Sequence, residues 1–161
     1  MGKLIAIVDP FPRSLELIFS KDKFKILKLK YELVYAPKNK KKFFYEKNIH
    51  KASFIIGQPD LPKNLLIKAK KLKAIINVES NFINNMDYQY CFKKGIHVIA
   101  TSPVFSKPVA EIALGMTLSL LRNIHTAHLD FTKGKEKYGL KSNLKASLLS
   151  GKKIGLLGFG D

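Results

Sequence analysis

Apolar and polar residues alternate along the first hundred positions in a pattern of short strands and helices. Compact apolar runs, typical of buried strands, occupy residues 4–8, 32–36, 53–56, 74–78 and 96–100. Helices are predicted at residues 14–19, 41–47, 62–72 and a segment from Asn84 or Asn85 to Phe92, whereas residues 22–30 fit neither period. Strands that alternate with helices form βαβ units, so this half predicts an α/β fold around a parallel sheet. Such sheets bind ligands at the carboxyl ends of their strands.

The longest predicted helix runs from Pro108 to about Asp130. Its first half is apolar on nearly every side, and a helix of that kind is covered from several directions. That is natural between two domains or in a subunit interface. Residues 134–150 are polar and rich in lysine, and the apolar run at residues 154–157 is predicted to be a final strand.

The chain carries a formal net charge of +17, from 29 basic and 12 acidic residues. Arg13 and Arg122 are the only arginines, and the lysines are spread over most of the chain. Proteins that bind nucleic acid rely on arginine for bidentate contacts to bases and phosphates. We therefore interpret the charge as a solvated lysine surface, with a dedicated nucleic-acid patch as the alternative.

Cys91 is the single cysteine, so a disulfide within the chain is excluded and a reducing compartment is indicated. The apolar run at residues 4–8 is too short for the core of a signal peptide. No continuous stretch reaches the ~18 apolar residues of a membrane span. The expectation is a soluble cytoplasmic protein with no membrane partner.

Two glycines, Gly158 and Gly160, follow the last apolar run. A dinucleotide-binding turn has the pattern Gly-x-Gly-x-x-Gly at the start of a helix, whose N-terminus holds the pyrophosphate. Gly158 and Gly160 match the first two positions, and the third would fall beyond Asp161. Turns use this pair freely, so its meaning depends on the rest of the chain.

Two stretches give it that meaning. The first runs from Leu72 to Val98 and includes Val78-Glu79-Ser80-Asn81-Phe82; the second runs from Val109-Ala110-Glu111 to Gly160. In order and spacing, residues 53–161 resemble the D-isomer-specific 2-hydroxyacid dehydrogenases. The resemblance implies a flavodoxin-like parallel-sheet substrate domain over residues 1–105. It implies the crossing helix and first strand of a Rossmann NAD(P)-binding domain over residues 106–161.

The same resemblance implies roles for individual residues. The loop of Ser80, Asn81 and Phe82 corresponds to the family's substrate loop, where backbone N–H groups hold the carboxylate of a 2-hydroxy or 2-oxo acid. The family often has glycine in this loop, so these three residues are a departure that affects loop geometry and substrate size. The resemblance also implies five cofactor-binding residues, of which the first two lie near the nicotinamide and the others form the pyrophosphate turn: Asn81, Val109, Gly158, Gly160 and Asp161.

No catalytic residue is predicted. In the family an arginine binds the substrate carboxylate and a histidine paired with an acid moves the proton, and all three lie beyond the glycine turn. Arg122 and His128 are not substitutes, because the resemblance places them on the crossing helix. We expect an N-terminal portion of a hydride-transferring enzyme that uses NAD or NADP, inactive alone and of doubtful cofactor binding by itself. A homodimer or a completing chain is the expected partner, and a non-enzymatic basic binding module is the alternative function.

Other candidate residues have simpler interpretations. His125 and His128 are one helical turn apart, but no third ligand is near, so no metal site is predicted. Glu79 has no partner positioned for acid–base chemistry and is interpreted as a loop residue. Cys91 is predicted to be a buried apolar residue, and Glu111 a first-turn carboxylate favoured by the helix dipole.

Overall fold

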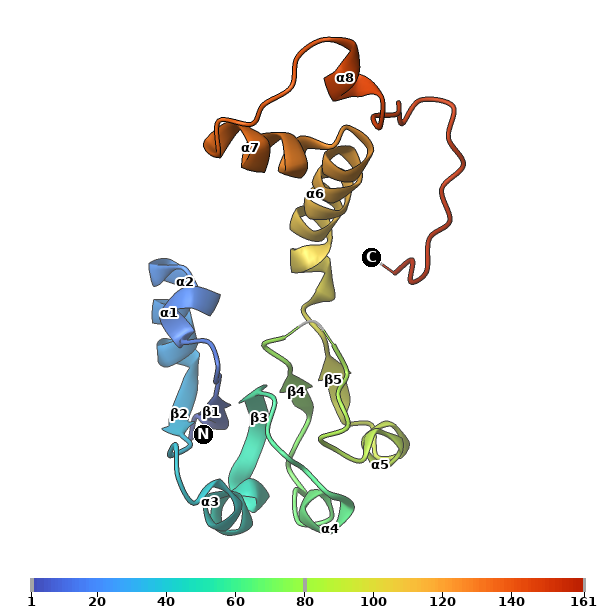
Figure 1. The fold of residues 1–161 in the computed structure, drawn as a ribbon. Helices are drawn as coiled ribbons and strands as arrows, with labels where there is room; N and C mark the ends of the chain where they lie inside the picture. Colours follow the sequence, from blue (N-terminus) through green and yellow to red (C-terminus); the bar gives the residue numbers. More distant parts are fainter. Residues whose placement is uncertain (1, 80, 161) are drawn as a thin grey trace. The chain divides into compact units, whose positions relative to one another are not determined.

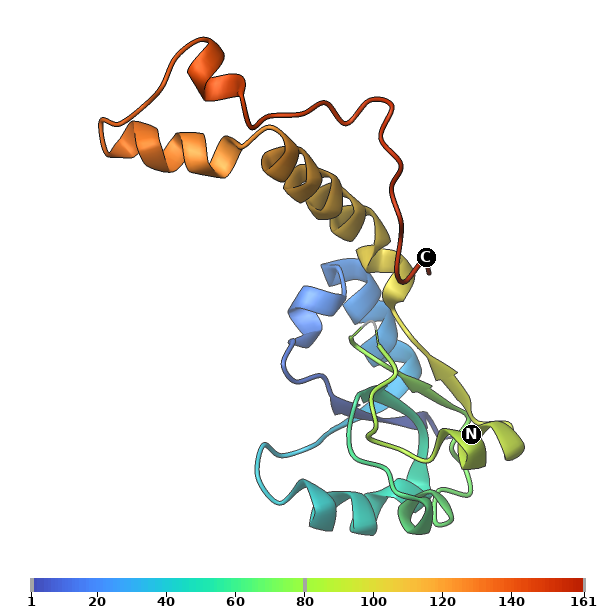
Figure 2. The same cartoon turned by 45° about the vertical axis from the view of Figure 1, so that its right-hand side comes forward.

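A five-stranded, all-parallel sheet forms the centre of the first of two compact units. The computed structural model describes residues 2–79 and 81–160, and it divides into Met1–Ser102 and Pro103–Asp161. The strand order is β2-β1-β3-β4-β5 (Figures 1 and 2). The strands are β1 (Leu4–Asp9), β2 (Tyr31–Tyr35), β3 (Ala52–Gly57), β4 (Ala74–Ile76) and β5 (His97–Ile99). This order is the flavodoxin-like arrangement, so the predicted fold class is confirmed.

Helices connect the strands and cover both faces of this sheet. They are α1 (Leu15–Ile18), α2 (Lys21–Lys30), α3 (Lys41–Asn48), the 3₁₀ turn η1 (Ile49–Lys51), α4 (Lys63–Leu66) and α5 (Tyr88–Lys93). Successive residues of a strand point to opposite faces, and each face has its own apolar cluster. Ile7, Ile55 and Ile75 pack on the side of α3, α4 and α5. Val8 and Ile56 pack with residues of α1 and α2 on the other side.

Gly57, the last residue of β3, lies against the last residue of β1. Its φ of +146° is a conformation that side-chain-bearing residues rarely adopt, and an added Cβ would lie within van der Waals overlap of the Asp9 carbonyl oxygen, at 2.0 Å. Only glycine lets the two strand ends approach this closely. Gly57 therefore fixes the edge of the sheet where the loops of the candidate site begin.

Several predicted helix boundaries in the first unit are wrong. Residues 22–30, left unassigned from the sequence, belong to α2. The helix predicted over residues 62–72 ends at Leu66 and continues as turns, although its apolar residues are buried as expected. The cap of α5 is neither Asn84 nor Asn85 but Asp87, whose carboxylate accepts a hydrogen bond from the Tyr90 backbone at 2.8 Å.

The second unit contains three helices within its described residues, α6 (Ser102–Leu121), α7 (Ile124–Thr132) and α8 (Leu140–Asn143). The long predicted helix is therefore interrupted, because Asn123 adopts a left-handed conformation with φ of 56°. It also begins at Ser102 rather than Pro108. The strand predicted at residues 154–157 is absent: these residues form no regular structure. A strand needs a neighbour to satisfy its backbone groups, and this unit contains no described strand to pair with.

Helix α6 is the longest helix of the described chain and is largely apolar. By length and composition it could cross a membrane, with a mean hydropathy of 1.4 over the best 18 residues and none of that window buried. The sequence expectation that no membrane-spanning candidate exists is thus too strict. Polar residues such as Lys107 and Glu111 interrupt any continuous apolar run, but the average over the window remains high.

Candidate functional site

The loop after β4, residues 77–83, lies at the carboxyl edge of the sheet and is the predicted substrate loop. β4 lies between β3 and β5, and β3 neighbours β1. Because the strands are parallel, the segments that follow β1, β3 and β4 leave the sheet at this same edge. Two of these segments hold the loop through side-chain contacts.

One contact comes from the segment after β1. The Arg13 guanidinium donates from Nε to Glu79 Oε1 at 2.9 Å and from a terminal nitrogen to Oε2 at 3.4 Å. Both side chains are about one-third exposed. This paired arrangement fixes the direction of the carboxylate as well as its distance. Glu79 thus has the loop role expected from the sequence, and its partner is one of only two arginines in the chain.

The second contact comes from the segment after β3. The Gln58 amide donates to the Asn81 carbonyl oxygen at 2.7 Å. Further along, Asn85 donates to the Pro59 carbonyl at 2.8 Å, and the Leu61 backbone donates to the Asn85 carbonyl at 2.7 Å. The substrate loop and its continuation are therefore fixed to the β3–α4 connection over several residues.

The backbone of the substrate loop keeps donors available. Within residues 2–79 and 81–160, the N–H groups of Asn81 and Phe82 donate no hydrogen bond. Both residues are exposed, and the Phe82 ring packs edge-on against Tyr88, with 5.3 Å between ring centroids. Exposed amides on a loop held at both sides are suited to binding an anion. Ser80, the third predicted member, lies outside the described residues.

Asn77 lies at the base of this loop and is fully buried. Its backbone N–H donates to the Ile99 carbonyl of β5 at 2.8 Å. Neither the oxygen nor the nitrogen of its side-chain amide has a hydrogen-bond partner among the described residues. A buried, unpaired amide costs about 1–3 kcal/mol, so this residue is a local cost to the fold directly beneath the loop.

A buried cluster at the end of β1 was not foreseen from the sequence. Asp9 is only 5% exposed, and its carboxylate binds Lys41 Nζ at 2.6 Å and accepts a hydrogen bond from the Tyr45 hydroxyl at 3.2 Å. Burial, reinforced by the Asp9 charge, raises the pKa of Tyr45 far above its ordinary value, so the hydroxyl stays a donor. The sequence offered one signal for this cluster, an acidic residue directly after an apolar strand. It did not indicate the partners of Asp9, because they lie 32 and 36 positions further along the chain.

The remaining predicted site residues belong to the second unit. Val109 lies on α6 and is 61% exposed. Gly158 has φ of +83°, a conformation that favours glycine, and nothing lies within 4 Å of a Cβ added at Gly158 or Gly160. The backbone of both glycines is therefore open to a ligand. Asp161 lies outside the described residues.

The histidines and the cysteine form no metal site among the described residues. Within the described chain no group of three or more His, Cys, Asp or Glu side chains could hold a metal ion. Cys91 is fully buried, as predicted for a small apolar residue, and burial raises the pKa of its thiol, with a smaller contribution from the Asp87 charge.

Comparison with known proteins gives one consistent family. The profile of the D-isomer specific 2-hydroxyacid dehydrogenase catalytic domain matches residues 5–144. A hydroxypyruvate reductase of Thermotoga maritima is 36% identical over 96 residues, which are 60% of this chain and 30% of that protein.

Solved structures agree with this match. A phosphoglycerate oxidoreductase of Rhizobium etli is 44% identical, with a TM-score of 0.72 over 98% of this chain and 49% of its own. An NADPH-dependent glyoxylate/hydroxypyruvate reductase of Sinorhizobium meliloti, in complex with NADP and malonate, has a TM-score of 0.66 at 20% identity, over 99% of this chain and 47% of its own. The latter likeness shows the fold alone. The chain spans between about a third and a half of the length of these relatives.

Proposed function

The chain belongs to the D-isomer specific 2-hydroxyacid dehydrogenase family, and we propose that its substrate loop binds the carboxylate of a small 2-hydroxy or 2-oxo acid. One observation carries this proposal: Asn81 and Phe82 are exposed residues whose N–H groups donate no hydrogen bond within the described chain, on a loop that other segments hold in place. We propose that the backbone N–H group of Ser80 is the third donor to the carboxylate. Fixed amides need no reorganisation to receive an anion.

The reaction that this binding serves is hydride transfer at C2 of the acid. A 2-hydroxy acid and NAD(P)⁺ give the 2-oxo acid, NAD(P)H and a proton, and the reverse reaction consumes that proton. The bound nicotinamide supplies the hydride acceptor or donor. The residues of this chain position the acid by its carboxylate, and none is assigned to the proton transfer. The name of the Thermotoga maritima relative, hydroxypyruvate reductase, supports this class of substrate.

For the cofactor, NAD or NADP, the proposed binding residues are those that the family resemblance indicates. Val109, Gly158, Gly160 and Asp161 would hold the dinucleotide, with Asn81 approaching the nicotinamide. The open backbone at Gly158 and Gly160 fits the close approach of a pyrophosphate. Membership of the family supports the cofactor class. The division into a substrate domain over residues 1–105 and a nucleotide-binding region from residue 106 is part of the same proposal.

We also propose that α6 is covered by protein, in a homodimer or by a completing chain. Its own unit leaves large apolar side chains more than half exposed, including Ile112, Met116 and Leu120. Exposed apolar surface of this extent is typical of an interface. A cytoplasmic location belongs to this proposal, since members of the family are soluble enzymes. No feature of the described residues favours the alternative of a nucleic-acid-binding module.

A titration of the ¹⁵N-labelled chain with hydroxypyruvate tests the proposal. We expect saturable amide shifts centred on residues 79–83. Phe82→Pro removes one N–H donor, whereas Phe82→Ala removes the same ring and keeps the donor. Binding should weaken at least about tenfold more in Phe82→Pro than in Phe82→Ala, the effect of one hydrogen bond to a charged group. Equal affinities of the two variants, or shifts confined to other regions, would contradict the assignment of the loop.

A further inference from the structure

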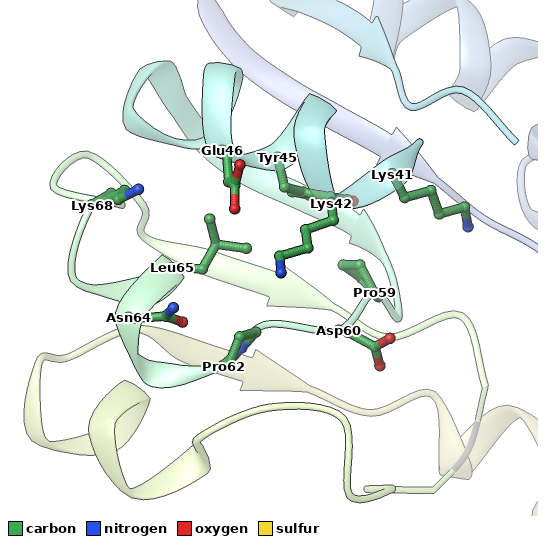
Figure 3. Close-up of a pocket in the computed structure, with 10 residues that line it drawn as sticks. All are labelled: Lys41, Lys42, Tyr45, Glu46, Pro59, Asp60, Pro62, Asn64, Leu65 and Lys68. Atoms are coloured by element: carbon green, nitrogen blue, oxygen red, sulfur yellow. The ribbon is translucent and has the colours of Figure 1, made fainter. Parts of the chain in front are cut away.

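A pocket of about 390 Å³ lies between α3 and the β3–α4 connection. None of its lining residues belongs to the substrate loop. Its floor is apolar: Leu65 and Tyr45 are buried there, next to Pro59 and Pro62. Figure 3 shows Lys42 and Glu46 extending from α3 toward Leu65, with Lys68 and Asp60 on opposite sides of it. The pocket therefore combines an apolar floor with charged groups around its rim.

The charges around this rim are balanced and unpaired. Lys42, Lys68, Glu46 and Asp60 contribute two ammonium and two carboxylate groups, which sum to zero. Among the described residues none of these four takes part in an ion pair or side-chain hydrogen bond. Lys41 also lines the pocket, but its ammonium is already bound to the buried Asp9 carboxylate at 2.6 Å.

The two opposite charges on α3 do not pair with each other. Lys42 and Glu46 are four residues apart on one face, but the lysine comes first, and this order pairs less favourably than glutamate before lysine. Their separate positions leave both charges available to a ligand. A simple anion here would meet two carboxylates, and a simple cation would meet two ammonium groups. A molecule with one charge of each sign and an apolar body matches the whole pocket.

We propose that this pocket binds a free α-amino acid with an apolar side chain. Its carboxylate is directed to Lys42 and Lys68, its ammonium group to Glu46, and its side chain to Leu65. The pocket is larger than such a ligand needs, which leaves room for bound water. This site is independent of the proposed dehydrogenase function, since it uses none of the residues assigned to substrate or cofactor.

The test is a titration of the ¹⁵N-labelled chain with L-norvaline, followed through the amides of residues 42–46 and 64–68. Two matched probes each lack one charge: pentanoate has no ammonium group, and butylamine has no carboxylate. We expect saturable shifts with L-norvaline and about two- to fivefold weaker binding of either probe, the effect of losing one ion contact near the surface. No saturation up to the solubility limit, or equal binding of pentanoate, would overturn the proposal.

Variants of the charged residues around the pocket test whether these side chains bind L-norvaline. Glu46→Gln and the double variant Lys42→Gln/Lys68→Gln should each weaken L-norvaline binding about threefold or more. Lys47→Gln, on the same helix but outside the pocket, should bind as the parent chain does. All four positions are exposed, so the fold should survive, and the dispersion of the amide spectrum verifies it. A loss of binding in Lys47→Gln equal to that in Glu46→Gln would also contradict the site.

Discussion

Arg13 and Glu79 are 66 positions apart in the sequence, yet Arg13 Nε lies 2.9 Å from Glu79 Oε1. The contact joins the segment after β1 to the loop after β4. It is the side-chain link through which the first turn beyond the sheet orients the proposed substrate loop. Its role is therefore expected in loop geometry more than in overall stability.

Removing the Arg13–Glu79 contact should affect ligand binding by the loop more than the stability of the fold. The coupling energy of Arg13 and Glu79, from a double-mutant cycle of Arg13→Met and Glu79→Gln, should be only about 0.5–1 kcal/mol in urea unfolding, because both side chains are partly exposed. Hydroxypyruvate binding should nevertheless weaken severalfold in either variant. Arg13→Lys serves as the control that keeps the charge but loses the paired geometry. Unchanged binding in all three variants would show that the loop is held without Arg13.

Gly57 should be the glycine of the first unit that tolerates substitution least. Gly57→Ala places a Cβ against the Asp9 carbonyl and requires a left-handed φ, so the free energy of unfolding should fall by about 4 kcal/mol or more. Gly95→Ala is the matched control, because Gly95 also has a positive φ of 68° but nothing within 4 Å of an added Cβ. It should cost only about 1 kcal/mol. Urea unfolding of the two variants measures the difference, and similar costs would mean that β1 and β3 are not so closely placed.

Cys91 should make the stability fall with pH in the alkaline range. The pKa of its buried thiol is raised above the ordinary value of 9.0, so the native chain keeps the proton that the unfolded chain releases. Stability is then fully present below pH 9 and declines as pH rises from there toward the folded pKa. In Cys91→Ala this part of the decline should disappear, although the cavity lowers stability at every pH. Unfolding measured from pH 8 to 10 checks the slope, and identical slopes in both proteins would exclude a contribution from Cys91.

Helix α6 should mediate self-association if a second copy covers it. Light scattering at increasing protein concentration should then show a dimer, and Ile112→Asp should shift the population to monomer, because a buried carboxylate without a partner is strongly unfavourable. Asn143→Asp, on α8, makes the same change of charge in the same unit and should leave association unchanged. A monomer at all concentrations in the parent chain would contradict the coverage of α6 by a second copy.

The pattern of apolar residues along the chain predicted the strands of the sheet correctly, but it did not predict where the helices end. Five apolar runs predicted five strands, because burial on both faces of a parallel sheet demands continuous apolar segments. The break at Asn123 and the early end of α4 depended on backbone conformations that the pattern of apolar residues does not encode. At residues 154–157 the apolar run alone was misleading, because a strand is a pairwise structure and its partner must be present.

The sequence by itself determined the α/β class and the family resemblance, and it indicated the loop that we propose binds the substrate, since all three depend on order and spacing along the chain. Only the tertiary structure decided which residues hold that loop. Arg13 and Gln58 come from segments far away in the sequence, and their contacts arise because parallel strands bring distant loops to one edge. The pocket between α3 and α4 has the same origin. Its four charges come from two separate segments, and no local pattern specifies that they share one apolar floor.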